Sequence, residues 1–185
     1  PELCVIRKDP SGINGMLLAA DLERAKKEAR NGGKLGRTVL EIRILTNPGE
    51  GAKAASALKA AGYAACDIEC SDPSTLLCIG FAVSPTEAYV FVGEALGAAL
   101  EIVADPTVRK VFQNGAFDAY FLKTRCGITV AGYDDDVMLM WHALWPEIAG
   151  KGKSGSKVTR KSLAFLASLY CESPELWKNY SGATE

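Results

Sequence analysis

An acidic pair in the middle of the chain has the residue types and spacing for metal-dependent chemistry. Asp67 and Glu69 flank Ile68 inside an apolar run typical of a β-strand. Side chains at i and i+2 of a strand point to the same face, so both carboxylates project together. Two anions held that close repel each other unless a cation lies between them, and Mg²⁺ prefers oxygen ligands. The pair therefore suggests a divalent metal site, although Asp-x-Glu is also common on a solvated strand face.

A second polar cluster lies in the segment Asn114 to Asp118. Asn114 ends an expected strand, and Asp118 falls in the first turn of the helix expected next. The i, i+4 spacing would place both side chains on one helix face if the helix begins early enough. An acid in the first turn also complements the helix dipole, which is the simpler explanation for Asp118. However, ligands of open α/β sheets bind where strands end and lead into helices, which favours a site here.

The pattern of apolar runs and turn residues predicts the elements that position these residues. Short polar turns separate the first three strands of the main domain, which favours antiparallel pairing, and strands and helices alternate afterwards. The expected strands cover residues 63–70, 76–83, 88–92, 110–113 and 128–130. The expected helices cover residues 52–61, 93–104, 116–125, 135–145 (ended by Pro146) and 163–171 (capped by Ser162). This order predicts an α/β fold, with a mixed sheet of three antiparallel strands and then parallel strands, flanked by helices.

Residues 1–46 differ from the rest of the chain. They hold a charged, helix-like stretch at 21–30, a glycine-rich break and an alternating, strand-like run at 38–45. We expect them to form an amino-terminal arm or the remnant of a preceding domain, and residues 47–185 to form the main domain.

Composition and charge exclude several classes of protein. The chain has 185 residues, 48% of them hydrophobic, and a formal net charge of −1. No run approaches the ~20 apolar residues of a membrane span, so we expect no membrane association. Without a global basic field, nucleic acid would be bound through metal ions or a local patch. Such a patch is offered by a run of basic residues, which is equally typical of a solvated loop: Lys151, Lys153, Lys157, Arg160 and Lys161.

The cysteines and the single histidine narrow the chemistry further. Six cysteines include no CxxC pair, which argues against a zinc ribbon. Cys66, Cys70 and Cys78 lie in strand-like apolar runs, where a free thiol behaves as a small hydrophobe. We expect reduced core thiols in an intracellular protein. A catalytic triad would have to be built around His142 alone, and we expect that residue, with Trp141 and Trp145, to pack in a core or an interface.

The two acidic clusters carry a resemblance to a known family. Ala65–Glu69, together with Ile79–Ala82, resembles the first motif of DEDD-type 3′–5′ exonucleases, and Val111–Asp118 resembles their second motif. Segments 134–144, 161–170 and 174–178 resemble the region that follows. Within that family, the chain is most similar to the proofreading domain of phage and bacterial family A DNA polymerases, the class of DNA polymerase I. The resemblance covers roughly residues 62–178.

The resemblance implies an RNase H-like fold and catalysis by two divalent ions, Mg²⁺ or Mn²⁺. Asp67 would contact both ions, Glu69 the first and Asp118 the second. The implied reaction is hydrolysis of the 3′-terminal phosphodiester of single-stranded DNA, releasing nucleoside monophosphates. A carboxyl-terminal polymerase domain would be the partner, in the cytoplasm of a bacterial or phage-infected cell.

The resemblance also implies roles around the metal site. Cys70, Gln113, Asn114 and Phe117 match positions that face the 3′-terminal nucleotide, although the family often has a small polar residue where Cys70 stands. Asp136 matches an aspartate that supports the site from behind. Capping of the following helix is the simpler explanation for the acidic run Asp134–Asp136.

One part of the family pattern is missing. The fourth carboxylate would come from a third motif beyond the Trp177-Lys178 element, and the chain ends at Glu185 before reaching it. We therefore expect a fragment, beginning at Pro1, with weak or no activity of its own. Two alternatives stay open: an RNase D-like exoribonuclease, and a non-catalytic domain that binds single strands or serves as a scaffold for a polymerase.

Overall fold

The computed structural model describes residues 13–33, 39–72, 74–145 and 161–171. The chain divides into two compact units. Residues 39–140 form one, here called the sheet unit, and residues 1–38 and 141–185 form the other, here called the helical unit. No helix among the described residues is long and apolar enough to cross a membrane.

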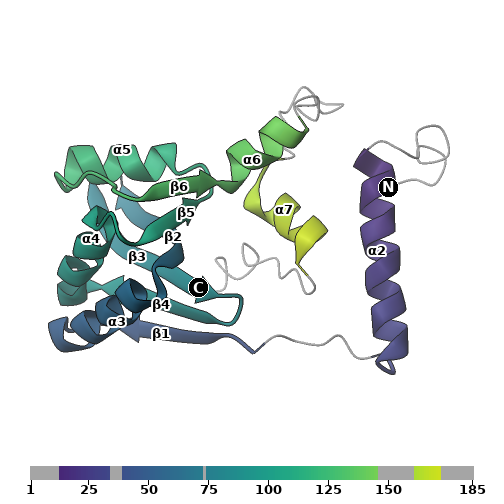
Figure 1. Ribbon diagram of the computed structural model, residues 1–185, viewed down its shortest axis with the longest axis horizontal. Helices are drawn as coiled ribbons and strands as arrows, with labels where there is room; N and C mark the ends of the chain where they lie inside the picture. The colour runs from purple at the N-terminus through teal and green to yellow at the C-terminus, as the bar shows by residue number, and fades with distance from the viewer. Residues whose placement is uncertain (1–12, 34–38, 73, 146–160, 172–185) are drawn as a thin grey trace. The chain divides into compact units, whose positions relative to one another are not determined.

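A six-stranded mixed sheet, with strand order β1-β4-β3-β2-β5-β6, organises the sheet unit (Figure 1). Its strands are β1 (Glu41–Leu45), β2 (Tyr63–Asp72), β3 (Thr75–Ser84), β4 (Glu87–Val92), β5 (Arg109–Phe112) and β6 (Tyr133–Asp136). Strands β2, β3 and β4 pair antiparallel, while the β1–β4, β2–β5 and β5–β6 pairs are parallel. The predicted α/β fold with three antiparallel strands followed by parallel ones is thereby confirmed.

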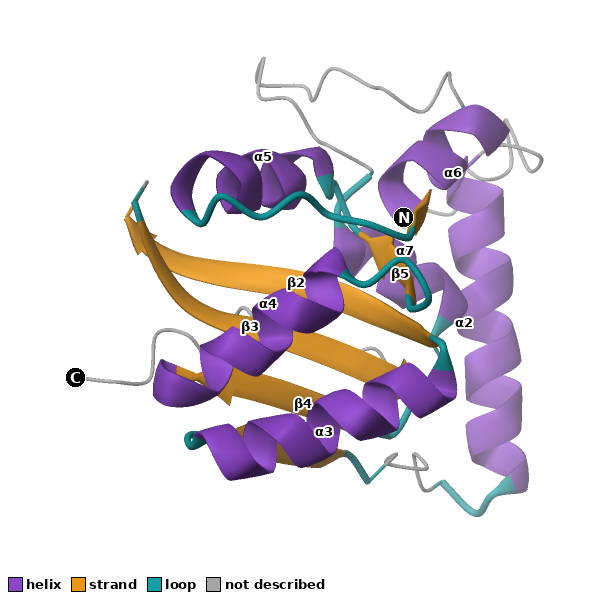
Figure 2. Ribbon diagram, turned by 60° about the vertical axis from the view of Figure 1, so that its left-hand side comes forward, coloured by secondary structure: helices purple, strands orange, loops and turns teal. Residues whose placement is uncertain are grey.

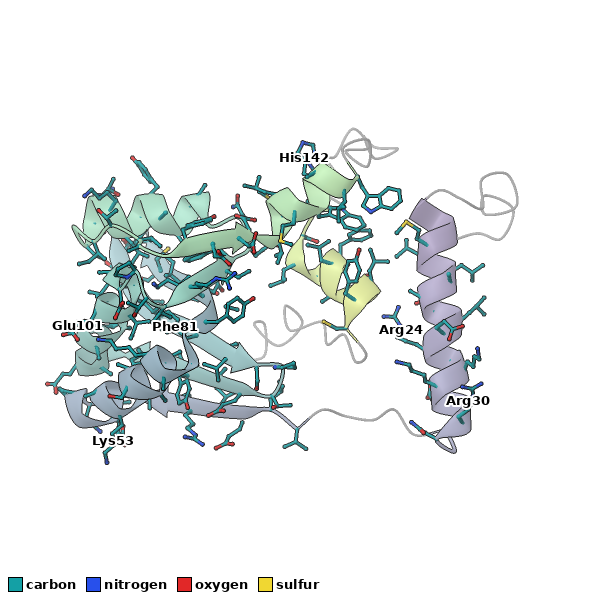
Figure 3. All side chains as sticks on the ribbon, viewed as in Figure 1. Arg24, Arg30, Lys53, Phe81, Glu101 and His142 are labelled. Atoms are coloured by element: carbon teal, nitrogen blue, oxygen red, sulfur yellow. The ribbon has the colours of Figure 1, made fainter. Side chains whose placement is uncertain are left out.

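Helices α3 and α4 cover one face of this sheet (Figure 2). The helices of the unit are α3 (Pro48–Ala61), α4 (Leu96–Ala104) after a short 3₁₀ turn, α5 (Ala116–Arg125) and the start of α6 (Val137–Leu144). Asn47 begins α3 by accepting a hydrogen bond from the Glu50 N–H at 3.0 Å. Lys53 on α3 and Glu101 on α4 point away from the sheet into solvent (Figure 3).

Strand β2 divides its side chains between core and solvent, as the alternation predicts. Ala64, Cys66 and Ile68 are buried, whereas Asp67 and Glu69 are exposed on the other face. The buried set packs in one core with β3, β4, α3 and α4, where Phe81 and Phe91 meet edge to face with centroids 5.8 Å apart. Burial of the apolar face thus fixes the direction in which the two acids point.

The strand expected at 128–130 is absent, and the sixth strand lies later. The backbone there closes the ends of two helices instead, since the Ile128 N–H donates to Leu122 O and the Ala131 N–H donates to Val103 O. Ile128 and Val130 pack against the core from this irregular segment, which explains their strand-like pattern. Strand β6 takes residues that were expected in the next helix, so α6 begins at Val137 rather than near residue 135.

Two elements near the amino terminus go beyond what the local pattern predicts. The strand-like run expected in the amino-terminal segment is β1, which pairs in parallel with β4 and forms an edge of the sheet. Its partner lies more than forty residues along the chain, a distance that a local pattern cannot reveal. Helix α2 (Ile13–Arg30) extends the helix expected at 21–30 toward the amino terminus.

The helical unit contains α2 and α7 (Leu163–Tyr170) among its described residues. Trp141 is buried as expected, with the rings of Trp145, Phe165 and Tyr170 about 6 Å away. His142 is exposed, so the expectation that it packs in a core is wrong for this residue. Ser162 caps α7 as predicted, accepting from the Phe165 N–H at 3.3 Å. The described cysteines are free thiols.

Candidate active site

Asp67 and Glu69 lie side by side on the exposed face of β2. Glu69 is opposite Cys78 of β3, and Asp67 is opposite Gly80. Because Gly80 has no side chain, the neighbouring strand leaves the space beside Asp67 open. On this face of the sheet, Glu69 therefore lies next to the thiol of Cys78, and Asp67 lies next to open space.

Asp118 joins this pair because β5 stops early. Strand β5 pairs with β2 only as far as Ala65, so the next N–H groups on that side of β2 have no strand partner. The Ile68 N–H, between the two acids, donates instead to Asp118 Oδ1 at 3.1 Å. Asp118 lies in the first turn of α5 and is only 4% exposed. One backbone hydrogen bond thus ties the second acidic cluster to the first.

Asp67 and each of the other two carboxylates repel one another. Burial, and next the charge of Asp67, raise the pKa of Asp118 to about 6, although the Ile68 N–H opposes this shift. Burial and the charge of Glu69 raise the pKa of Asp67 as well. None of the ion pairs between described residues involves these three acids. The site carries negative charge that the described side chains do not neutralise.

The turn between β5 and α5 is built around the carboxylate of Asp136. Its two oxygens accept from the N–H groups of Asn114, at 3.1 Å, and Gly115, at 2.8 Å. Asn114 adopts a left-handed conformation with φ 59°, which asparagine tolerates better than most residues. A Cβ on Gly115 would lie 2.4 Å from Phe112 Cβ and 2.7 Å from the Tyr133 hydroxyl oxygen, so only glycine fits. Asp136 and this glycine set where α5 begins, and hence where Asp118 stands.

Asp136 also caps α6, as the simpler explanation for the acidic run predicts. The same carboxylate therefore holds the turn before α5 and begins the next helix. Its Oδ1 accepts from the Met138 N–H at 2.9 Å and from the Leu139 N–H at 3.3 Å. Burial raises its pKa, but the donated N–H groups and the Tyr133 hydroxyl outweigh burial, leaving the pKa below the ordinary value. Conversely, burial and the bond to Asp136 raise the pKa of Tyr133 to about 12. Asp134 pairs with Arg109 instead of capping a helix.

Tyr133 and Gly115 belong to this arrangement and were not singled out in the sequence. Tyr133 donates to Asp136 at 3.0 Å and stacks on Phe112 with centroids 4.7 Å apart. The sequence Asn114-Gly115 could have predicted a tight turn. No sequence pattern indicates that Tyr133 contacts Asp136.

The four residues expected to face a nucleotide lie around the acids. Gln113 follows β5, and Asn114 is the exposed residue of the turn. Cys70 follows Glu69 on β2, and Phe117, at 53% exposure, precedes Asp118 on α5. Cys70 and Phe117 line a common hollow beside the acids.

The basic residues expected to contact phosphate lie elsewhere. Lys151, Lys153, Lys157 and Arg160 are outside the described residues. Lys161 belongs to the helical unit, where its Nζ lies 2.7 Å from His142 Nδ1.

The donor set fits a hard divalent cation. All three groups are carboxylates, the type of oxygen ligand that Mg²⁺ and Mn²⁺ prefer, and a cation would relieve the repulsion that raises the pKa of Asp67 and Asp118. In the described part of the chain, no three acidic, histidine or cysteine side chains already converge as a ligand set. Asp118 Oδ1 is turned toward the Ile68 N–H, so joint ligation would require carboxylate rotation.

Comparison with known proteins identifies the family. A sequence model of the 3′–5′ exonuclease family matches residues 42–184. Since this match spans most of the chain, the chain belongs to the 3′–5′ exonuclease family. A search among curated proteins found no match.

Solved structures show the same fold. Escherichia coli RNase D, an exoribonuclease involved in structured RNA processing, is 14% identical with a TM-score of 0.57. The likeness covers 79% of this chain and 37% of RNase D, so the chain spans well under half of that relative. The EXD2 exonuclease domain soaked in Mg and dGMP is 19% identical, with a TM-score of 0.49 and coverage of 78% of this chain and 77% of that domain. The likeness to RNase D confirms the RNase H-like exonuclease fold.

Proposed function

We propose that this chain supplies the catalytic carboxylates of a metal-dependent exonuclease that hydrolyses the 3′-terminal phosphodiester of a single-stranded nucleic acid. The observation that carries the proposal is the hydrogen bond from the Ile68 N–H to Asp118 Oδ1, which brings both acidic motifs to one place. Membership of the 3′–5′ exonuclease family supports degradation from the 3′ end of the strand.

Asp67, Glu69 and Asp118 would hold the divalent ions, with Asp67 between the other two. Bound there, two ions would activate the attacking water and stabilise the leaving 3′ oxygen. The protein's own contribution is positional: β2 aims two carboxylates from a rigid sheet, and Asp136 holds the turn that places the third. Asn114 and Phe117, exposed beside Asp118, would orient the terminal nucleotide.

For the substrate, we propose DNA, with the domain proofreading for a linked polymerase. The support is the resemblance of residues 65–69 and 111–118 to the motifs of family A polymerase proofreading domains. RNA is the second candidate, because RNase D, which shares the fold, is an exoribonuclease. Matched DNA and RNA oligonucleotides with single-stranded 3′ ends separate the two: we expect faster release from DNA, and faster release from RNA would favour the RNase D-like alternative.

The test of the activity is release of nucleoside monophosphates with Mg²⁺ or Mn²⁺, measured with enzyme in excess over a 3′-labelled strand. We expect Asp67→Ala and Glu69→Ala to abolish release. Glu101→Ala is the matched control, since this exposed acid on α4 points away from the sheet (Figure 3). Because weak or no release is expected of this chain by itself, Mn²⁺ binding is measured alongside. Release that survives Asp67→Ala, or Mn²⁺ binding that Asp67→Ala leaves unchanged, would overturn the proposal.

A further inference from the structure

A hollow of about 240 Å³ lies beside the acidic site, within the sheet unit. Its lining comes from the end of β2 and from one side of α5: Cys70, Phe117, Tyr120, Phe121, Thr124 and Arg125. We call it the α5 groove. No acidic residue lines it, but two of its lining residues, Cys70 and Phe117, are chain neighbours of Glu69 and Asp118.

Helix α5 supplies to this groove a stripe of three aromatic rings followed by a threonine. Phe117, Tyr120, Phe121 and Thr124 follow the i, i+3, i+4, i+7 spacing of one helix face. Phe121 is buried at the base, with its centroid 6.3 Å from that of Phe117. Tyr120 is 72% exposed, so its ring is accessible from solvent. The stripe begins beside Asp118 and extends along α5 for about 10 Å, at 1.5 Å per residue.

Arg125 closes the far end of the stripe. It is exposed and forms no ion pair with another described residue. Exposed rings with a free guanidinium at one end match what a single strand offers, since bases stack on aromatic side chains and arginine binds phosphate oxygens. An apolar peptide would use the rings but would leave the arginine without a role.

We propose that the α5 groove binds a single-stranded nucleic acid on the 5′ side of its terminal nucleotide. A base stacks on Tyr120, and Arg125 contacts a phosphate of the same strand. Tyr120 and Arg125 lie outside the two motifs at 65–69 and 111–118, and here they act as positioning residues for the strand. The inference rests on the proposed function, because it needs a strand whose 3′ end lies at the carboxylates.

Binding to the full chain tests the stacking contact. A fluorescent oligothymidylate is titrated without divalent metal, so that no cleavage occurs, and its anisotropy is followed. We expect Tyr120→Ala to raise Kd about tenfold, as for the loss of one stacked base. Tyr120→Phe and Tyr120→Trp should retain affinity, because they keep a ring at the position. Circular dichroism verifies that each variant is folded.

Salt dependence tests the phosphate contact. For single strands, each neutralised phosphate contributes about 0.7 to the slope of log K against log salt. Arg125→Ala should lower the slope by about that amount, whereas Lys123→Ala should leave it unchanged. Lys123 is the matched control, an exposed cation on the same helix that is absent from the groove lining.

A substrate without an upstream nucleotide separates this inference from the proposed function. With the p-nitrophenyl ester of thymidine 5′-monophosphate, Tyr120→Ala should release p-nitrophenol at the unaltered rate, and Asp67→Ala should release none. If Tyr120→Ala and Arg125→Ala bind oligonucleotides like the unaltered chain, the groove inference is overturned and the proposed function stands. If Tyr120→Ala slows the ester as much as the oligonucleotide, the groove is also not an upstream subsite. If Asp67→Ala keeps its activity, the proposed function fails.

Discussion

Asp118→Asn removes a negative charge that the folded protein holds at a cost in stability. Burial and the charge of Asp67 raise the pKa of Asp118 from 3.8 to about 6. Between those two pH values the folded chain binds more protons than the unfolded chain, so the free energy of unfolding falls as pH rises through this window. A shift of about two pKa units corresponds to about 3 kcal/mol.

The variant should therefore be more stable than the unaltered chain at pH 8, by up to about 3 kcal/mol. Asparagine keeps the side-chain oxygen that accepts from the Ile68 N–H, so the tie to β2 survives. At pH 4 and below Asp118 is itself largely protonated, and the advantage of the variant should disappear. Urea denaturation at both pH values, with a chelator present, measures the difference.

Two further measurements make this prediction sharper. Glu101→Gln removes an exposed acid on α4 and should not reproduce the pH-dependent gain. Millimolar Mg²⁺ at pH 8 should stabilise the unaltered chain more than Asp118→Asn, because a ligand that binds only the folded state raises stability. A variant that is equally stabilised at pH 4 and pH 8, or less stable at pH 8, would refute this account of the buried charge.

Three other substitutions test the framework of the site by urea denaturation. Gly115→Ala should lower the free energy of unfolding by about 1–3 kcal/mol, because its Cβ would lie 2.4 Å from Phe112 Cβ. Gly97→Ala is the control: it lies in open space on α4 and should be neutral or stabilising by up to about 1 kcal/mol. Equal effects of the two substitutions would contradict the tight fit at Gly115. Asp136→Asn should lower the free energy of unfolding by about 1–3 kcal/mol at pH 7, since donated N–H groups stabilise the charged carboxylate and lower its pKa. The loss should shrink as pH falls and the carboxylate protonates. A loss that does not depend on pH would show that the charge of Asp136 does not contribute to stability. Lys110→Met should lower the free energy of unfolding by at least about 3 kcal/mol, because the buried ammonium donates to three carbonyl oxygens. An unchanged stability would show that these carbonyl oxygens do not require the ammonium as a donor.

Local pattern was sufficient where neighbouring residues in the chain decide the structure. The alternation of β2 fixed which side chains enter the core, so Asp67 and Glu69 had to share the other face. Helical spacing and capping residues located α3, α5 and α7 to within a few residues. The prediction of a strand at 128–130 was wrong, because apolar side chains can also reach a core from an irregular segment. Here the backbone of that segment forms hydrogen bonds with the ends of two helices.

By itself, the sequence determined the class of fold, the facing of the acidic pair and the membership of an exonuclease family. Only the tertiary structure decided how the two acidic clusters meet. That meeting depends on β5 ending early, which leaves the Ile68 N–H free of a strand partner and able to donate to Asp118. It also depends on Asp136, which holds a turn 22 residues before it in the chain. Long-range hydrogen bonds of this kind leave no periodic trace, because each one joins residues whose separation along the chain is set by the topology of the sheet.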